Sequence, residues 1–359
     1  MPAPQSIERL LVIRRDNIGD LVCTTPLIAA LRRRFPRARI CALVNSYNLP
    51  VLEGNPDLDA VYAYTKAKHR PPGTGILSVY WNRLRVMLEL RRERFDYAIV
   101  AGASFLWRGL YLARQARPRH IIGFTPPQGH PHIDVGIPYT LPRPMHEIED
   151  IFRLLAPLGI DGPPPPTRLF AAPGPVAQAR AALHARNLGH GELVIGVHIS
   201  ARLPSNRWPA ANFVALMRQL HERHGASFIL LWAPGSSSNP QHPGDDEKAR
   251  EIWGALPGLP LVPYRTEQLR ELIAALALCD LVVCSDGGAM HIAAGLGKPI
   301  VCFFGDSDAA RWHPWGVPHV MLQPESRDAS GIRVDDGLAA VTQLLEANRP
   351  QQSTSRGAC

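Results

Sequence analysis

The feature that most constrains the fold is a glycine-rich turn between two short apolar runs in the last third of the chain. The runs, residues 281–284 (LVVC) and 299–304 (PIVCFF), are rich in β-branched and aromatic residues, as buried parallel strands are. Between them lie the turn 285–291 (SDGGAMH) and a segment, 289–296, of the length and composition of a short helix. This succession predicts an open parallel sheet, which binds ligands at the carboxyl ends of its strands.

The turn itself has two interpretations. Gly287 and Gly288 let the backbone approach a phosphate, and the helix that begins at Ala289 offers unpaired amide groups to an anion. Asp286 and His291 stand five residues apart around the helix start, so either can project into the same crevice. Alternatively, Asp286 is only an N-cap and His291 a packed core histidine. The turn alone leaves both interpretations open.

A second glycine turn follows the first predicted strand. Residues 9–14 have the pattern of a buried strand, residues 15–20 (RDNIGD) form a turn, and residues 21–35 have helical spacing. The helix ends in three arginines, 32–34, which suit the negative end of its dipole. The acidic residue of this turn is Asp20.

Strands and helices alternate through the rest of the chain, which indicates βαβ units and parallel sheets. Pro-, Gly- and His-rich residues 123–144 and residues 305–316 are predicted to be loops. The further predicted strands are 38–44, 60–64, 96–101, 192–199 and 227–232, and the further predicted helices are 49–54, 76–94, 146–158, 177–187, 211–224, 245–256, 267–278 and 334–347.

The best domain boundary is the run of four prolines at 163–166, a stiff extended segment. We expect two domains facing each other across a cleft, with the Asp20 turn on one wall and the Asp286 turn on the other. The predicted parts are an N-terminal Rossmann-like domain (1–162), a Pro-rich linker (163–175), a C-terminal Rossmann-like domain (176–335), a C-terminal helix (336–349) and a disordered tail (350–359).

Net charge and motif content limit the classes of partner that the chain can be expected to bind. The chain has 359 residues, 46% of them hydrophobic, and a net charge of +8, which favours acidic partners such as nucleotide phosphates or an anionic membrane surface, unless the charge serves solubility alone. No nucleic-acid motif accompanies it, so no nucleic-acid partner is expected. His130 and His132 lack a third ligand at suitable spacing, and no other metal-ligand cluster is visible, so neither a metal nor a cofactor is expected.

The location follows from cysteine usage and from the start of the chain. The six cysteines form no Cys-x-x-Cys pair, and most lie in or beside apolar runs, as reduced core cysteines do. The first residues lack a signal peptide's basic start and apolar core, and no apolar run reaches the ~18 residues of a membrane span. We expect a cytoplasmic protein. The basic, amphipathic helix 76–94 would either press on an anionic membrane or acceptor, or be a solvated helix face.

Three blocks resemble a known family: residues 19–27 (GDLVCTTPL) after the first strand, residues 206–209 (NRWP), and residues 285–299 (SDGGAMHIAAGLGKP) followed by Phe304 and Gly305. They resemble glycosyltransferase family 9, the ADP-heptose:lipopolysaccharide heptosyltransferases, over roughly residues 10–314. The resemblance implies a GT-B fold, in which two Rossmann-like domains face each other across a cleft. It also implies an inverting, metal-independent transfer of heptose from ADP-heptose to a hydroxyl of a lipopolysaccharide core or similar glycolipid, at the inner face of the inner membrane.

The resemblance also implies roles for single residues. Asp20 takes the place of the catalytic aspartate. The nucleotide-sugar loop corresponds to Asp286, Gly287, Gly288, Ala289 and His291, and Asp245 to an acidic residue near the nucleoside. Asn206 stands where the family usually has a phosphate-contacting lysine, so either Arg207 or Arg202 reaches the diphosphate instead, or the affinity for the donor is lower, or the donor is different.

The chemistry calls for these residue types. Inversion by a single displacement needs a base for the acceptor hydroxyl, and a carboxylate on a glycine turn at the cleft can serve. The departing diphosphate needs amide groups and cations. The alternative for Asp20 is a helix N-cap.

Two other functions remain in view. A nucleotide-sugar 2-epimerase shares the GT-B layout and needs no acceptor. A non-catalytic nucleotide-sugar-binding protein would account for Asn206 in place of lysine. A Rossmann dehydrogenase is disfavoured, because no Gly-x-Gly-x-x-Gly follows the first strand.

Overall fold

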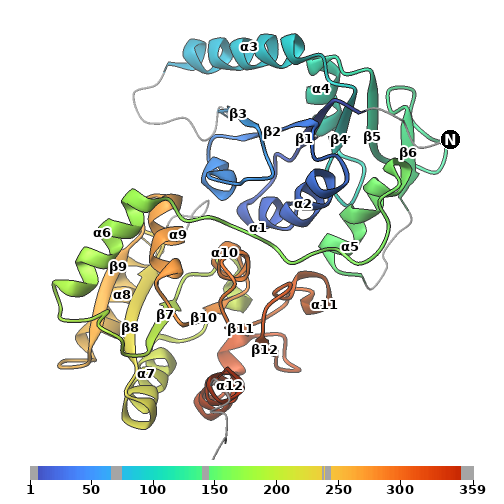
Figure 1. The fold of residues 1–359 in the computed structure, drawn as a ribbon. Coiled ribbons are helices and arrows are strands. Elements are labelled where there is room, and N and C mark those ends of the chain that lie inside the picture. Colours follow the sequence, from blue (N-terminus) through green and yellow to red (C-terminus); the bar gives the residue numbers. More distant parts are fainter. Residues whose placement is uncertain (1–6, 66–74, 140–144, 237, 239–243, 349–359) are drawn as a thin grey trace, which may run out of the picture.

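The computed structural model describes residues 7–65, 75–139, 145–236, 238 and 244–348. They form two six-stranded sheets, each flanked by helices (Figure 1). All neighbouring strands pair in parallel. The predicted α/β fold with two Rossmann-like units is therefore confirmed.

The first sheet has the spatial order β3-β2-β1-β4-β5-β6. Its strands are β1 (Arg9–Ile13), β2 (Arg39–Asn45), β3 (Ala60–Tyr64), β4 (Tyr97–Val100), β5 (His120–Thr125) and β6 (Val135–Pro138). The helices of this half are α1 (Ile18–Val22), α2 (Thr25–Arg34), η1 (Leu49–Leu52), α3 (Ile76–Glu93), α4 (Trp107–Ala116), α5 (Glu147–Phe152) and η3 (Arg153–Leu158).

The second sheet has the order β12-β11-β10-β7-β8-β9, which is the same topology as the first when read from its other edge. Its strands are β7 (Val194–His198), β8 (Ser227–Trp232), β9 (Leu261–Arg265), β10 (Leu281–Ser285), β11 (Ile300–Phe303) and β12 (His319–Leu322). The helices are α6 (Pro173–His184), η4 (Pro204–Asn206), α7 (Ala210–His224), α8 (Asp246–Gly254), α9 (Leu269–Ala277), α10 (Gly288–Gly295), α11 (Ala309–Trp312), η5 (Ala329–Gly331) and α12 (Val334–Ala347).

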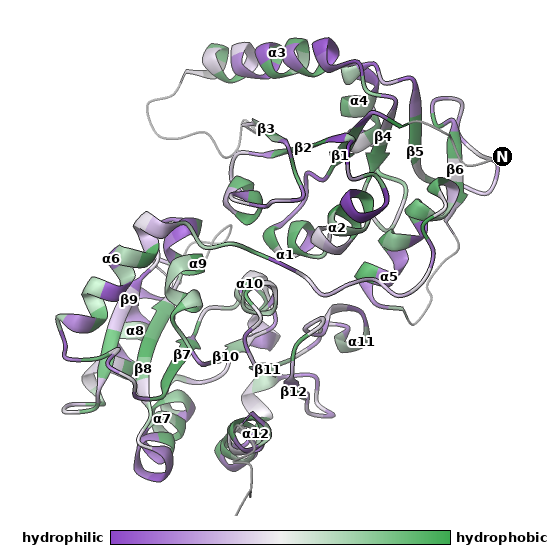
Figure 2. Ribbon diagram, in the orientation of Figure 1, coloured by the Kyte–Doolittle hydropathy of each residue, from purple (hydrophilic) through white to green (hydrophobic). Residues whose placement is uncertain are grey.

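Burial explains why the central strands read as continuous apolar runs. β7, β10 and β11 are buried along their whole length, because helices cover both faces of the sheet. Figure 2 shows the hydrophobic colouring of β7 and β8 in the second half. Edge strand β6, by contrast, alternates between half-buried and exposed residues.

The two halves touch through the helices that follow β1 and β10. Helix α1 packs against α10, and one buried apolar cluster continues from the first half into the second. The connecting segment is held to both sides, since Arg168 donates its backbone N–H to Thr25 Oγ1 at 3.1 Å and Leu169 donates to the carbonyl of Gly295 at 2.7 Å. A Cβ on Gly295 would come within 2.2 Å of Leu169 Cδ1, so any larger residue there would require the Leu169 side chain to move. The residue boundaries predicted for the domains and linker stay a prediction.

Several local predictions were wrong. Residues 21–35 are not one helix: α1 ends at Val22, and α2 begins at Thr25 with Pro26 in its first turn, because proline suits a helix start but not its interior. The predicted loop 123–144 contains the end of β5 and all of β6, and the loop 305–316 contains α11. Helix α4 and strands β9 and β12 were not predicted.

The predicted helix 146–158 is a short α-helix, α5, followed directly by the 3-10 helix η3. The remaining predicted elements are present, with ends shifted by up to four residues. Strands 60–64 and 227–232 and helix 334–347 have the predicted ends. The tail 350–359 lies outside the described residues. None of the helices in the described part of the chain has the length and apolar character needed to cross a membrane.

Candidate active site

Asp20 lies in α1, directly after the turn that follows β1. The predicted alternative, an N-cap, is wrong: the N-cap of α1 is Asn17, and Asp20 is the third residue of the helix. Its carboxylate reaches back, so that Oδ2 accepts a hydrogen bond from the backbone N–H of Asn17 at 2.9 Å. The Asp20 side chain is 13% exposed, so it is not fully enclosed by the protein.

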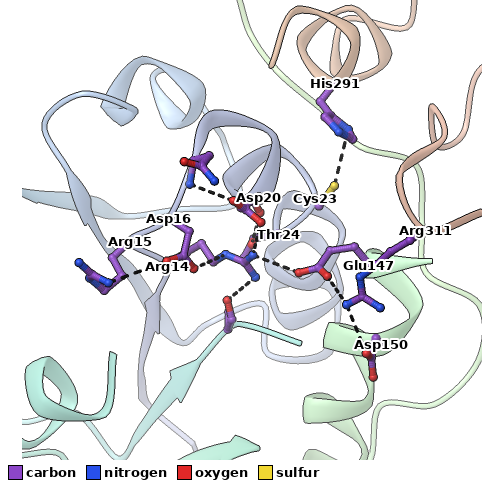
Figure 3. A network of polar contacts seen from close by, with 12 residues as sticks. Arg14, Arg15, Asp16, Asp20, Cys23, Thr24, Glu147, Asp150, His291 and Arg311 are labelled. Carbon is purple, nitrogen blue, oxygen red and sulfur yellow. Dashed lines mark hydrogen bonds and ion pairs between the residues drawn. The ribbon is translucent and has the colours of Figure 1, made fainter. Parts of the chain in front are cut away.

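Arg14 holds the other oxygen of Asp20. This buried guanidinium donates from Nη2 to Asp20 Oδ1 at 2.6 Å and to Glu147 Oε1 at 3.0 Å, while Nη1 donates to the carbonyl of Ala101 at 2.7 Å (Figure 3). Burial alone would lower the pKa of Arg14, but the carboxylates of Asp20, Glu147 and Asp16 outweigh burial and raise it. The guanidinium therefore stays charged.

The same network reaches the second half of the chain. Glu147, at the start of α5, accepts from Arg14 with one oxygen and from Arg311 of α11 with the other. Arg311 also lies 3.5 Å from Asp150. A continuous line of alternating charges thus joins Asp20 to the C-terminal half (Figure 3).

The Asp286 turn lies at the carboxyl end of β10. Gly287, the N-cap of α10, has φ 155° and ψ −169°, a combination that favours glycine. Asp286 does not cap the helix. Its backbone N–H donates to the carbonyl of Phe303 at 2.9 Å, and its Oδ2 accepts from Asn206 Nδ2 at 3.2 Å. Gly288 and Ala289 form the first turn of α10.

The two turns meet across the interface. A Cβ on Gly288 would contact Ile18 at 3.4 Å, and a Cβ on Gly19 would come within 2.5 Å of His291 Cδ2. His291 is 5% exposed, and its Nδ1 lies 3.7 Å from the Sγ of Cys23. Burial lowers the pKa of His291, against the opposing effects of Asp286 and Asp20, so both carboxylates act on this one ring. The two predicted walls therefore face each other.

The topology places the two turns after different strands of their sheets. Both halves have the same strand order, yet Asp20 follows the first strand of its sheet and Asp286 follows the fourth strand of its own. The two turns are therefore not at equivalent positions. First and fourth strands are neighbours where the strand order reverses, the usual ligand position in open α/β sheets, so each turn lies beside that point in its own half.

Asn206 is a buried connector. With 2% exposure, it donates from Nδ2 to Asp286 and to Ser307 Oγ at 2.9 Å, and its Oδ1 accepts from the N–H of Gly305 at 2.8 Å. Both of its N–H donors are thus engaged within the protein. Asn206 fixes the carboxylate of Asp286 and joins η4 to the segment after β11.

Several buried polar atoms near the carboxyl edge of the second sheet have no partner among the described residues. They are Asp245 Oδ2, Arg207 Nη2, His198 Nδ1 and Ser285 Oγ. His198 and Ser285 end the neighbouring strands β7 and β10. Since buried polar groups in proteins are nearly always paired, unpaired atoms along the edge where open α/β sheets bind ligands are candidates for contact with a ligand or a water molecule.

Lys248 lies among these residues. Its Nζ donates to the carbonyls of Ile199 at 3.1 Å and Trp208 at 2.7 Å. Burial lowers the pKa of Lys248 to about 8, opposed by Asp245 and assisted by Arg207. Burial and Lys248 together lower the pKa of His198 to about 4. Asp245 and Arg207 thus act on the pKa of Lys248, and Lys248 acts on the pKa of His198. These four residues therefore lie close enough to interact electrostatically.

Sequence reasoning missed the charged neighbours of these residues. Arg14 and Glu147 are 133 positions apart, and nothing local signals their pairing. Lys248 had a weaker signal, as a cation one turn after Asp245. Arg207 was predicted to face the donor, but its Nε is bound to the carbonyl of Ala201 at 3.0 Å, which leaves Nη2 as its available donor. Arg202 is exposed. Among the described residues, no three His, Cys, Asp or Glu side chains could hold a metal ion together.

Two Rossmann-like sheets of parallel strands, with an acid-bearing turn from one against a glycine turn and helix start from the other, are the arrangement of the GT-B fold. Comparison with known proteins agrees. The family model described as "Glycosyltransferase family 9 (heptosyltransferase)" matches residues 83–330. The chain belongs to glycosyltransferase family 9, and it is a glycosyltransferase.

Individual relatives support the assignment. The chain is 25% identical over 351 residues to "Lipopolysaccharide heptosyltransferase 3" of Escherichia coli, covering 92% of this chain and 97% of the relative. A family 9 glycosyl transferase structure from Veillonella parvula has a TM-score of 0.81 at 20% identity, with 97% and 99% of the two chains covered. The structure of E. coli ADP-heptose lps heptosyltransferase II has a TM-score of 0.73 at 20% identity, with 94% and 99% covered.

Proposed function

We propose that this glycosyltransferase moves a heptose from ADP-heptose to a hydroxyl of a lipopolysaccharide core, or of a similar glycolipid, with inversion at the anomeric carbon and without a metal ion. The observation that carries the proposal is the approach of α1 to α10, which brings Asp20 and the Asp286 turn to one interface. The sugar and the acceptor class are taken from the names of the related heptosyltransferases.

Asp20 is the base in this proposal. Its carboxylate takes the proton of the acceptor hydroxyl as the hydroxyl oxygen attacks the anomeric carbon. The bond from that carbon to the diphosphate oxygen breaks, and ADP leaves with the bonding electrons. Arg14 and the Asn17 amide fix the orientation of the carboxylate, and they still leave it free lone pairs for the incoming proton.

The second half holds the donor. The diphosphate lies at the start of α10, where the amides of Gly287, Gly288 and Ala289 and the ring of His291 surround it. The unpaired atoms of Asp245 and Arg207 bind the nucleoside side of the donor. Asn206 acts through Asp286, which it orients, and does not touch the phosphate.

The reaction takes place in the cytoplasm, on the inner face of the inner membrane. This part of the proposal rests on the sequence pattern and on an acceptor of the lipopolysaccharide class.

The experiment is a transfer assay with the purified chain, a panel of ADP- and UDP-sugars, and core glycolipids that lack successive heptoses. We expect release of ADP together with a mass gain of one heptose on one acceptor. Nuclear magnetic resonance of the product should show the anomeric configuration opposite to that of the donor. Chelation of divalent cations should leave the rate unchanged.

Other outcomes would replace this function. A new sugar formed from the donor alone, without acceptor, would make the protein an epimerase. Donor binding in calorimetry without transfer to any acceptor would favour a non-catalytic binding protein. Asn206 motivates this alternative, because its side-chain N–H groups bond Asp286 and Ser307 within the protein.

A further inference from the structure

Helix α3 presents an apolar stripe to solvent. Its inner side chains, among them Val86, Met87 and Leu90, are buried against the first sheet. On the outer side, Leu77, Tyr80, Trp81, Leu84 and Leu88 are 81%, 59%, 70%, 47% and 43% exposed. Their spacing of three to four residues places them along one side of the helix. A helix on the outside of a soluble domain normally carries polar residues there.

Helix α4 extends the stripe. Trp107 and Tyr111, in its first two turns, are 61% and 49% exposed. α4 packs beside α3, and the guanidinium of Arg83 lies 5.5 Å from the ring centre of Tyr111. These two residues and the five of α3 form what we call the outer patch. It holds seven of the eleven large hydrophobic side chains that are exposed in the described part of the chain, so the exposure is concentrated and not scattered.

The segment that carries the outer patch is rich in arginine. Residues 76–119 contain nine arginines and three acidic residues, a net charge of +6 in a chain whose total is +8. All three acidic residues are already paired, Glu89 with Arg85, Glu93 with Arg39 and Asp96 with Arg119. Arg92, Arg108 and Arg114 are among the exposed arginines. The segment therefore exposes both large apolar side chains and a net positive charge.

The part of the outer patch at the start of α3 and α4 lies at the same end of the sheet as Asp20. A helix that connects two parallel strands runs antiparallel to them, so its first residues lie at the carboxyl edge of the sheet. The first half of α3, with Leu77, Tyr80 and Trp81, follows β3, and Trp107 follows β4. Asp20 follows β1 at this edge. In Figure 1, α3 lies on the outside of the first half, away from the second sheet, and Figure 2 shows hydrophobic and hydrophilic residues alternating along it.

We propose that the outer patch docks the protein onto a bilayer surface that carries anionic headgroups. Trp, Tyr and Leu side chains enter the interface between headgroups and acyl chains, and the arginines bind the anionic headgroups. Charge decides between the occupants: a second copy would bring one cationic surface against another, which is unfavourable, whereas an anionic bilayer is complementary. The proposed function supplies only the reason for such docking, a lipid-borne acceptor, and the docking is tested without donor or acceptor.

The test is flotation of the full-length protein with two kinds of vesicle, phosphatidylcholine alone and phosphatidylcholine mixed with phosphatidylglycerol. We expect binding to the mixed vesicles and much weaker binding to the neutral ones, and we expect added salt to weaken it. The double variant Trp81→Gln and Leu84→Gln should reduce binding about tenfold, because two interfacial anchors are removed. The double variant Arg85→Gln and Arg92→Gln should reduce binding to the mixed vesicles only.

The matched control is Trp253→Gln on α8. Trp253 is 45% exposed and lies 5.6 Å from the guanidinium of Arg186, so it resembles Trp81 but belongs to the other half. Its binding should equal that of the wild type. Circular dichroism and thermal unfolding should show that all variants are folded, since every substituted side chain is exposed.

Equal binding to both vesicles, or full binding by the Trp81 and Leu84 double variant, would overturn the proposal. The proposal would also be overturned if light scattering showed that the wild type is a dimer and that the Trp81 and Leu84 double variant is a monomer. In that case a second copy of the chain would cover the outer patch. Transfer to an acceptor without acyl chains should be unaffected in the double variant. If the wild type showed no transfer activity with any donor and acceptor, the proposed function would be wrong, but the vesicle-binding result would still hold.

Discussion

Nη2 of Arg14 donates a hydrogen bond to Oδ1 of Asp20 at 2.6 Å, and the Arg14 side chain is almost fully buried. The same nitrogen also holds Glu147, whose side chain is 4% exposed. Two carboxylates thus share one cation in a place that water scarcely reaches. The carboxylate at the centre of the proposed reaction is fixed by a charge from its own domain, and through Glu147 it is linked to Arg311 of the other.

Replacement of Arg14 by Met should therefore destabilise the protein. The change leaves buried carboxylates without their counter-charge, which costs about 3–5 kcal/mol of unfolding free energy. Chemical denaturation at neutral pH measures the loss. Arg85→Gln, which breaks an exposed pair with Glu89 on α3, is the control and should cost less than about 0.5 kcal/mol. Equal losses in the two variants would show that the network does not stabilise the fold.

Gly19 sets how closely the two halves approach. A Cβ at this position would come within 2.5 Å of His291 Cδ2, so Gly19→Ala must push α1 and α10 apart or move the ring. We expect an unfolding free energy lower by about 1–3 kcal/mol, together with slower transfer. Gly254→Ala is the control, because nothing lies within 4 Å of its would-be Cβ at the end of α8; alanine there should be neutral or stabilise by up to about 1 kcal/mol. Wild-type stability and activity in Gly19→Ala would contradict the close packing.

The stability of the fold should fall in acid through His146. This residue is the N-cap of α5: its Nδ1 accepts from the N–H of Ile148 at 3.1 Å, and its Nε2 lies 2.9 Å from the carbonyl of His313. Burial, first of all, lowers the pKa of His146 to about 3. Between this value and the unfolded value near 6.5, the unfolded chain binds more protons, so stability is fully present above pH 6.5 and is lost as pH falls toward 3.

His146→Asn tests this assignment, because asparagine can still cap the helix and does not titrate. The unfolding free energy of the variant should fall less steeply than that of the wild type between pH 6.5 and 4. His190→Asn, at an exposed position, should keep the wild-type slope. Identical slopes for the wild type and His146→Asn would show that another group carries the acid sensitivity.

Asn206→Ala should weaken the donor side of the site. The change leaves Asp286, Ser307 and the amide of Gly305 without their shared partner, and we expect an unfolding free energy lower by about 1–3 kcal/mol with weaker binding of ADP. Ser307→Ala removes only one of these contacts and should cost about 0.5–1.5 kcal/mol. Thermal unfolding and calorimetry with ADP measure both effects. Unchanged ADP affinity in Asn206→Ala would separate Asn206 from the binding site.

The parts predicted well from sequence are those whose physics is local. Strands such as β10 read clearly, because burial on both faces makes them continuously apolar. Edge strand β6, with its half-exposed pattern and a terminal proline, carries no such signal. The break between α1 and α2 was readable at Pro26, which fits the first turn of a helix. The outer stripe of α3 could not be recognised, because the side of a helix that faces a sheet is defined only by the fold.

The site divides in the same way. Asp20 and the Asp286 turn were identifiable because glycine, acid and helix start follow one another in the chain. Their ion-pair partners were not, since Arg14, Glu147 and Arg311 come together only through tertiary structure. From the sequence, Asn206 was noted only because it lacks the positive charge of the family lysine. In the structure it is the hydrogen-bond partner of Asp286.

The most direct test of the central claim, that Asp20 faces the donor turn and serves as base, is the transfer rate of Asp20→Asn with donor binding measured alongside. The account predicts a kcat lower by about 10²–10⁴ with unchanged affinity for ADP, since asparagine keeps the shape but not the basicity. Asp16→Asn is the matched control: Asp16 lies 3.2 Å from Nε of the same Arg14 and should retain most of the activity. Near-normal transfer by Asp20→Asn would contradict the account.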